Sequence, residues 1–111
     1  MKKNKNKKYK KVFGNPDRPR ISVFRSNKSI YAQVIDDSSG RTLTSSSSIE
    51  KIFRDCKKNN KTDLSMKVGR LLGNRIKKLN IKKLVFDKGR YLYHGRVKSL
   101  ADGIREIGLD F

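Results

Sequence analysis

The sequence predicts one domain of the mixed α/β class, with strands and helices in the order β-β-β-α-β-α. Three short segments between residues 21 and 47 have the composition and alternation of strands, and two later segments carry one apolar stripe at helical spacing. A further extended segment lies between these two helices, which favours its parallel entry into the same sheet. We therefore expect a mixed sheet with an antiparallel meander and one parallel strand, with the helices on one face.

A basic tail precedes this domain. The first eleven residues, MKKNKNKKYKK, contain seven lysines and no acidic residue. Such a segment buries too little apolar surface to order itself, so we expect it to be disordered until a polyanion neutralises it. It belongs to a flexible basic tail of residues 1–17, and residues 18–111 are expected to form the domain. The candidate phosphate contacts in the tail are Lys2, Lys3, Lys5, Lys7, Lys8, Lys10 and Lys11.

The first two strands are ISVFRS and IYAQVID, with NK between them as a tight hairpin. In the second strand, Ile30, Ala32 and Val34 alternate with Tyr31 and Gln33, so one face is apolar and the other carries an aromatic ring and an amide. The third strand, RTLTSSS, is rich in hydroxyl groups. Because both helices have a single apolar stripe, we expect the second sheet face to remain open, with Phe24, Tyr31 and Gln33 available to a ligand.

The helices have recognisable start and stop signals. Ser47 and Glu50 have the spacing of a capping box and predict a short helix with Ile49, Ile52 and Phe53 on one side. Thr62 or Asp63 is expected to cap the long helix, and Gly108 to end the last one. The apolar stripes are Leu64, Val68, Leu71, Leu72, Ile76 and Leu79 in the long helix, and Val97, Leu100, Ala101, Ile104 and Ile107 in the last one. NIKKLVFDKG between them predicts a buried strand.

Charge is the strongest functional signal. The chain has 29 Lys and Arg against 10 Asp and Glu, a formal net charge of +19. A field of this size attracts polyanions, and nucleic acid is the first candidate because each phosphate contact releases a counterion. We find no apolar run of membrane-spanning length and no lipidation signal, so no membrane partner is expected. One cysteine, one histidine and no nucleotide-binding motif predict no metal, no cofactor and no small-molecule substrate.

The segment GRYLYHGRVK admits a catalytic or a binding interpretation. His94 has no second titratable partner nearby in sequence, and a carboxylate-dependent nuclease built from Asp36, Asp87 and Asp102 is a minor alternative. Between residues 82 and 98 there are six Lys and Arg and one acid, interleaved with aromatic rings that can stack on unpaired bases. One of the two tyrosines is as well explained by packing against the domain. The candidate contacts are Lys88, Arg90, Tyr91, Tyr93, His94, Gly95, Arg96 and Lys98.

The chain resembles a known family. RPRISVFRSNKSIYAQVIDD and YHGRVKSLADGIREIGLDF closely resemble bacterial-type large-subunit ribosomal proteins of the L-eighteen family, over residues 18–111. The resemblance implies a non-enzymatic protein that binds 5S rRNA, helps dock it onto large-subunit rRNA in the central protuberance, and contacts a neighbouring 5S-associated ribosomal protein. The RNA-contacting positions that it implies are Arg18, Arg20, Arg25, Ser26, Asn27, Lys28, Tyr31, Gln33, Lys88, Tyr93, His94, Gly95 and Arg96.

Two features depart from this family, and one alternative stays open. The amino-terminal segment is short and rich in lysine where many members are longer and rich in arginine, and Arg90 stands where small residues are frequent. A general nucleic-acid chaperone would use the same charge without specificity. The abundance of Lys, Asn and Ile resembles products of AT-rich genomes, so the expected location is the ribosome of a plastid stroma or of a bacterial cytoplasm.

Overall fold

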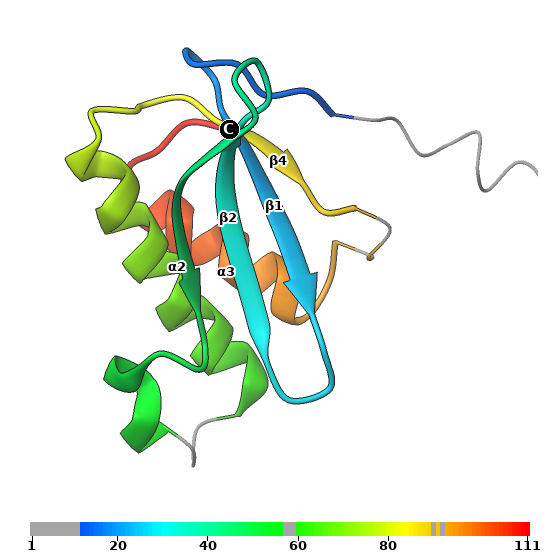
Figure 1. Cartoon of the computed structure of the whole chain (residues 1–111). Helices are drawn as coiled ribbons and strands as arrows, with labels where there is room; N and C mark the ends of the chain where they lie inside the picture. The colour runs from blue at the N-terminus through cyan, green and yellow to red at the C-terminus, as the bar shows by residue number, and fades with distance from the viewer. Residues whose placement is uncertain (1–11, 57–59, 90, 92) are drawn as a thin grey trace, which may run out of the picture.

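The computed structural model describes residues 12–56, 60–89, 91 and 93–111. A four-stranded sheet packs against two long helices, and both helices lie on the same side of the sheet (Figure 1). The fold class predicted from the sequence and the order of its elements are confirmed. The tail contacts predicted between Lys2 and Lys11, and the contact predicted at Arg90, lie outside the described residues.

The sheet consists of β1 (Arg20–Arg25), β2 (Ile30–Asp36), β3 (Arg41–Ser47) and β4 (Val85–Asp87). Their order is β3-β2-β1-β4, with antiparallel pairs in the meander and a parallel pair between β1 and β4. The predicted parallel strand is therefore present, although it is short. The β1–β2 connection of residues 26–29 turns at Asn27 and Lys28, as predicted, and the Ser26 N–H donates across this turn to the Ser29 carbonyl at 2.9 Å.

In the described part of the chain, three helices complete the fold: the 3-10 helix η1 (Lys51–Cys56), α2 (Lys61–Lys78) and α3 (Arg96–Glu106). The side chain of Asn60 caps α2, accepting the Asp63 backbone N–H at 2.8 Å. The N-cap predicted at Thr62 or Asp63 is wrong because asparagine, which caps as well as aspartate, stands just before the first turn. Gly108 has φ +97° directly after the end of α3, as the sequence predicts.

The core lies between the helices and the inner face of the sheet. Its centre consists of Val68, Leu72 and Ile76 from α2, Val97, Leu100 and Ile104 from α3, and Ile21, Ile30 and Val34 from the sheet. The predicted stripes are confirmed except at the end of α2, where Leu79 is 46% exposed. The stripe predicted for the short helix is wrong for Ile49 and Ile52, which are 65% and 66% exposed, because only Phe53 reaches the core.

Buried glycines set the distance between α2 and α3. A Cβ atom on Gly69 would collide with the carbonyl oxygen of Leu100, and one on Gly103 would collide with that of Met66. The two backbones therefore touch where neither residue has a side chain. This contact positions α3 against α2, and the start of α3 carries part of the candidate site described below.

The capping box predicted at the end of β3 is partly present. The Ser47 N–H donates to Glu50 Oε2 at 2.9 Å, while the Ser47 hydroxyl accepts the N–H of Ile49 instead of that of Glu50. Arg75 of α2 donates to both carboxylate oxygens of Glu50, at 2.7 and 2.9 Å. These hydrogen bonds, that from Arg75 foremost, lower the pKa of Glu50 from its ordinary value of 4.5.

The Glu50–Arg75 pair predicts a pH dependence of stability. The folded state favours the charged carboxylate, so the pair stabilises the domain above pH 4.5 and the contribution is lost as the pH falls through the lowered pKa. Glu50→Gln should lose about 0.5–1 kcal/mol of unfolding free energy at neutral pH. Urea unfolding of both proteins across the acid range should show this difference shrinking as the pH falls. A difference that stays constant with pH would contradict the assignment.

The chain joins the domain at Gly14. Its N–H donates to Asp37 Oδ2 at 2.7 Å, and its carbonyl accepts the Asp37 N–H at 2.9 Å. A Cβ atom at Gly14 would collide with the backbone nitrogen of Arg20. Gly14, which the sequence analysis assigns to the tail, is therefore bonded to the β2–β3 turn.

Candidate nucleic-acid interface

Four basic residues gather where the β1–β2 loop meets the beginnings of α2 and α3. We call Arg25, Lys28, Lys61 and Arg96 the loop-end cluster. Arg25 is the last residue of β1, Lys28 lies in the loop, and Lys61 and Arg96 are the first residues of the two helices. Figure 1 shows the loop and the start of α2 at the same end of the domain. The cluster thus depends on the tertiary fold, since its members are far apart in sequence.

Hydrogen bonds to backbone groups position the cluster. Arg96 Nη2 donates to the Ser26 carbonyl at 2.9 Å, and Lys61 Nζ donates to the Asn27 carbonyl at 2.6 Å. Both helices therefore hold the same loop. Each bond uses one donor of a cationic group and leaves its other donors for a ligand.

Tyr91 fixes the loop from the other side. Its hydroxyl accepts the Arg25 N–H at 3.1 Å and donates to the Arg25 carbonyl at 3.2 Å. The guanidinium carbon of Arg25 lies 4.8 Å from the centre of the Tyr91 ring. Tyr91 also packs against the core, so of the two predicted tyrosine contacts it is the one that supports the domain.

The two arginines of the cluster repel each other. Burial, and then the charge of Arg25, lower the pKa of the Arg96 guanidinium, which nevertheless stays protonated. Within the described residues, neither guanidinium has a carboxylate at ion-pair distance. An anion placed between the two guanidinium groups would relieve this repulsion. A phosphate suits this place because its oxygens accept hydrogen bonds from the N–H groups of both arginines.

A shallow hollow of about 10 Å³ lies between Lys28, Lys61 and Arg96. It is too small for a base, since ligand pockets measure roughly 300 Å³ or more. Its rim suits the oxygens of a polyanion backbone. Lys61 is a residue that the sequence analysis missed, because its position in a polar breaker segment gave no sign that it reaches the loop.

The outer face of the sheet next to the cluster is open, as predicted. Phe24 is 60% exposed, and its ring centre lies 6.0 Å from that of Tyr31 on the neighbouring strand. Gln33, two residues after Tyr31 on the same face of β2, is also exposed. Phe24 and Tyr31 offer stacking positions for bases on this open face, and the four cations offer phosphate contacts at the end of the domain where β1 and β2 are joined.

The segment before α3 presents the remaining predicted contacts in different ways. His94 and Lys88 are exposed. The Tyr93 ring packs edge-on against Phe86 with centres 6.0 Å apart, and its hydroxyl accepts from Arg105 at 2.8 Å, so only part of the ring faces outward. Gly95, with φ +56°, allows the turn into α3. Lys98 forms an exposed ion pair with Asp102, and this carboxylate competes with a phosphate for the Lys98 ammonium group.

Arg20 lies at the opposite end of β1, roughly 17 Å from Arg25 at about 3.3 Å per residue, and Arg18 precedes the strand. Arg18 is exposed. Arg20 instead donates to both oxygens of Asp37, at 2.8 and 3.0 Å, and to Asp87 at 3.0 Å. Asp37, and then Asp87, raise the pKa of Arg20. Its charge is already balanced, so the geometry gives Arg20 a role in joining β4 to the meander.

Tyr91→Phe tests the support of the loop-end cluster. Loss of the hydroxyl leaves the Arg25 N–H and carbonyl without their side-chain partner, which should lower the unfolding free energy by about 1 kcal/mol. The ring remains, so the core should keep its packing. Thermal unfolding measures the change, with Tyr31→Phe on the open sheet face as the control. Equal stability of Tyr91→Phe and wild type would show that the hydroxyl does not hold the loop.

Comparison with known proteins decides the family. The model of the family described as "Ribosomal L18 of archaea, bacteria, mitoch. and chloroplast" matches residues 1–111. The chain belongs to the ribosomal L18 family. This confirms the resemblance noted from the sequence, and with it a structural, non-enzymatic role in the ribosome.

Curated relatives of this L18 chain are bacterial proteins named large ribosomal subunit protein uL18. The one from Thermotoga petrophila is 55% identical over 103 residues, covering 92% of this chain and 84% of the relative. The one from Aster yellows phytoplasma is 53% identical over 107 residues, covering 92% and 93%. The one from Desulfotalea psychrophila is 52% identical over 102 residues, covering 92% and 84%.

Asp36, Asp87 and Asp102, the carboxylates of the nuclease alternative, each have a separate partner and do not meet in one centre. Asp36 accepts from Ser38 and Ser39 in the β2–β3 turn, whereas Asp87 pairs with Arg20 and Asp102 with Lys98. In the described ranges, no group of three His, Cys, Asp or Glu residues is arranged to hold a metal ion. Within the same ranges, no helix has the length and apolar character needed to cross a membrane.

Proposed function

We propose that this member of the L18 family binds 5S rRNA through the loop-end cluster and the open sheet face. By this proposal it helps attach 5S rRNA to the large-subunit rRNA in the central protuberance. The observation that carries the proposal is the approach of Arg25 and Arg96, two guanidinium groups without a carboxylate partner among the described residues. The repulsion between these two positive charges destabilises the free protein locally, and a phosphate bound between them would remove it.

Each part of the surface has a distinct proposed role. The four cations of the loop-end cluster contact phosphates, Phe24 and Tyr31 stack on unpaired bases, and polar side chains contact base or sugar edges. The contacts assigned to polar and peripheral groups are Ser26, Asn27, Gln33, Lys88, Tyr93, His94, Gly95 and Lys98. Arg18 and the tail lysines contact phosphates farther away, and Arg20 and Tyr91 hold the surface in shape.

A family resemblance supports two further parts of the proposal. The protein partner is a neighbouring 5S-associated ribosomal protein, and the ribosome that contains both lies in a bacterial cytoplasm. The relatives named above are all bacterial, which favours that location over a plastid stroma.

Competition between RNAs tests the proposal against the general chaperone. Labelled 5S rRNA is titrated with the full chain, and unlabelled 5S rRNA or tRNA is then added. We expect tRNA to compete poorly, because the loop-end cluster and the aromatic rings have fixed positions. Equal competition by the two RNAs would favour a chaperone that uses charge alone. Binding that does not weaken with added salt would contradict the phosphate contacts themselves.

A further inference from the structure

A cleft lies at the end of the domain opposite the loop-end cluster. It has a volume of about 310 Å³ and lies between the turn that follows α2 and the C-terminal residues. This volume reaches the size of ligand-binding pockets, unlike the hollow in the loop-end cluster. The residues proposed above to bind RNA do not line it.

Backbone hydrogen bonds hold the two walls of the cleft together. The Leu84 N–H donates to the Asp110 carbonyl at 2.9 Å, and the Asp110 N–H donates to the Lys82 carbonyl at 3.0 Å. Lys83 and Asp110 thus form an isolated parallel bridge outside the named strands. A ligand would meet a preformed site and would not have to order these segments.

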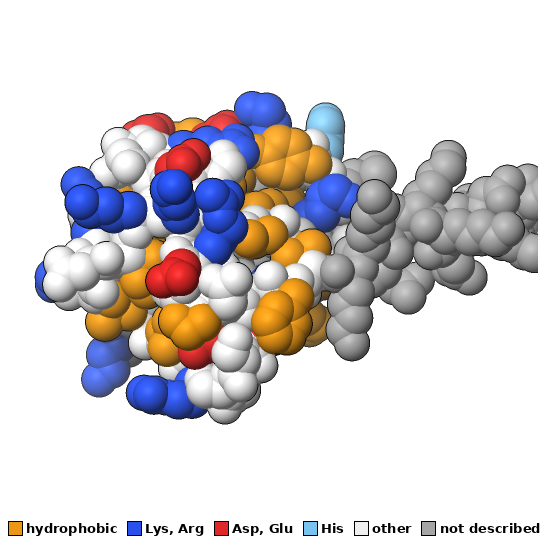
Figure 2. Space-filling view, turned by 90° about the horizontal axis from the view of Figure 1, so that it is seen from above, with side chains coloured by type: hydrophobic (Ala, Val, Ile, Leu, Met, Phe, Trp, Pro, Cys, Tyr) orange, Lys and Arg blue, Asp and Glu red, His pale blue; other side chains and the backbone are white. Residues whose placement is uncertain are grey.

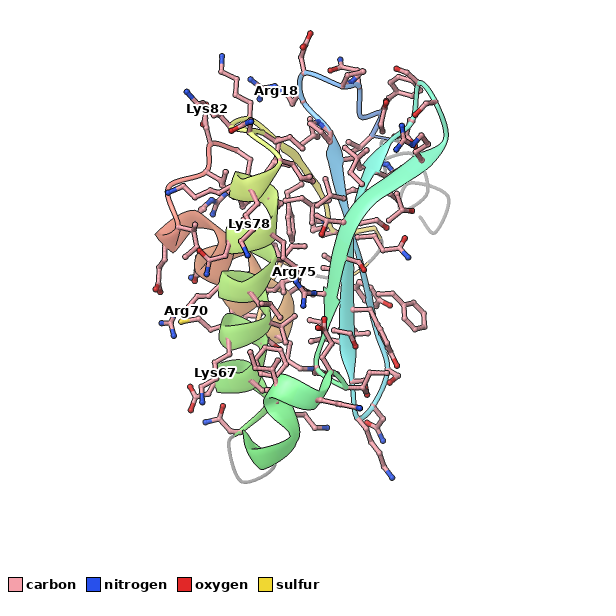
Figure 3. All side chains as sticks on the ribbon, turned by 60° about the vertical axis from the view of Figure 1, so that its left-hand side comes forward. Arg18, Lys67, Arg70, Arg75, Lys78 and Lys82 are labelled. Atoms are coloured by element: carbon pink, nitrogen blue, oxygen red, sulfur yellow. The ribbon has the colours of Figure 1, made fainter. Side chains whose placement is uncertain are left out.

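The rim of the cleft is basic. Lys77, Lys82 and Lys83 line it, and all three side chains are exposed. None of them has a carboxylate at ion-pair distance in the described ranges. Lys77 in the last turn of α2 also offsets the helix dipole, but Lys82 and Lys83 lie beyond that turn. Figure 3 shows Lys82 and Arg18 extending from this same end of the molecule.

The floor of the cleft is apolar and one wall carries an acceptor. Leu109 is buried and Ile81 half-buried, while the exposed Asp110 lies in the lining beside them. Seen from this end, hydrophobic side chains lie among Lys and Arg side chains on the surface (Figure 2). An apolar floor accepts the face of a base, and a carboxylate accepts hydrogen bonds from the N–H groups of its edge.

We propose that this cleft binds one unpaired nucleotide of an RNA, with its base against Ile81 and Leu109 and its phosphates at the lysines. Asp110 accepts from the base edge and therefore favours guanine, whose adjacent N–H groups match both carboxylate oxygens. The inference rests on the proposed RNA-binding function and adds a second contact to it. Because the two sites lie at opposite ends of a domain 42 Å in its longest extent, one chain contacts two separate RNA segments.

Mononucleotides test the cleft without any large RNA. The ¹⁵N-labelled full chain is titrated with GMP, UMP or inorganic phosphate while backbone amide signals are followed by NMR. We expect GMP to move the signals of residues 80–83 and 108–110 and to bind about fivefold or more tightly than UMP, the effect of one bidentate pair. Phosphate alone should shift these signals less at equal concentration. No shift there, or equal shifts with phosphate and GMP, would overturn the proposal.

Variants separate the base contact from the phosphate contact. Asp110→Ala should bind GMP and UMP equally, because the carboxylate that distinguishes them is gone. Lys82→Gln with Lys83→Gln should weaken GMP binding several-fold, whereas Lys51→Gln, an exposed lysine of η1, should not. If GMP binding is insensitive to both cleft variants, the site is elsewhere.

Binding of 5S rRNA to the same variants is a separate readout. Lys82→Gln with Lys83→Gln should weaken 5S rRNA binding no more than two Lys→Gln changes outside both sites do, because the cleft holds an RNA segment separate from the one at the loop-end cluster. A chain that binds GMP in the cleft but does not bind 5S rRNA would refute the proposed function and leave the cleft assignment intact. A chain that binds 5S rRNA but does not bind GMP in the cleft would refute the cleft assignment alone.

Discussion

Replacing Arg25 and Arg96 together by glutamine is expected to weaken 5S rRNA binding about a hundredfold at physiological ionic strength. Hydrogen bonds to charged groups contribute about 1.5 kcal/mol or more each, and two of them correspond to a factor of this size. The plot of log affinity against log salt should also become shallower, by about one unit of slope for each arginine. Gel-shift titrations at several salt concentrations measure both quantities.

A matched variant separates this effect from the loss of net charge. Arg41→Gln with Arg70→Gln removes the same charge from exposed residues that lie outside the loop-end cluster. We expect it to cost less than tenfold in affinity. Circular dichroism should show both double variants folded. Among the described residues Arg96 makes one tertiary hydrogen bond, whose loss also removes the repulsion with Arg25, and the Arg70–Glu106 ion pair is exposed and adds little to stability. Equal affinities of the two double variants would refute the role of the cluster.

Ile104→Asp is expected to unfold the domain. Ile104 is 0% exposed in the middle of α3, where it faces the core shared with α2. An aspartate there buries a charge without a partner, and the cost of about 4 kcal/mol or more is comparable to the stability of a domain of this size. The far-ultraviolet spectrum should lose its helical signal at room temperature, and no cooperative thermal transition should remain.

Ile104→Val provides the conservative comparison at the same position. Removal of one methylene group should lower the unfolding free energy by about 1 kcal/mol while the cooperative transition remains. An Ile104→Asp variant that melts at the wild-type temperature would show that the side chain does not face the core, and would therefore contradict the arrangement of α2 and α3.

The main elements of the fold could be predicted because burial imposes a period on the sequence. Ile30, Ala32 and Val34 alternate along β2, and the stripe through Val68, Leu72 and Ile76 follows the helical repeat. Gly69 and Gly103 were not recognised as contact points, because a glycine has no apolar side chain to enter such a pattern. Their importance lies in the close approach of two helices, which depends on three-dimensional packing.

The candidate site could be predicted only as a set of residue types. Arg25, Lys28 and Arg96 were identified from charge and from resemblance, but Lys61 joins them through a hydrogen bond to a loop 34 residues earlier. For Tyr91, the sequence left packing and RNA contact open, and the structure shows that its hydroxyl bonds to the backbone of Arg25 and its ring packs against the core. Arg20 has the same guanidinium group as Arg25, but it donates hydrogen bonds to Asp37 and Asp87. Partners of this kind come from distant segments and leave no local signal.

Capture of RNA by the purified chain tests the central claim most directly. The full chain is immobilised and mixed, at physiological ionic strength, with total cellular RNA from which all protein has been removed, and the retained RNA is sequenced. The proposal predicts strong enrichment of 5S rRNA over tRNA, and loss of this enrichment when Arg25 and Arg96 are replaced. Retention of 5S rRNA and tRNA in proportion to their abundance would contradict specific binding of 5S rRNA.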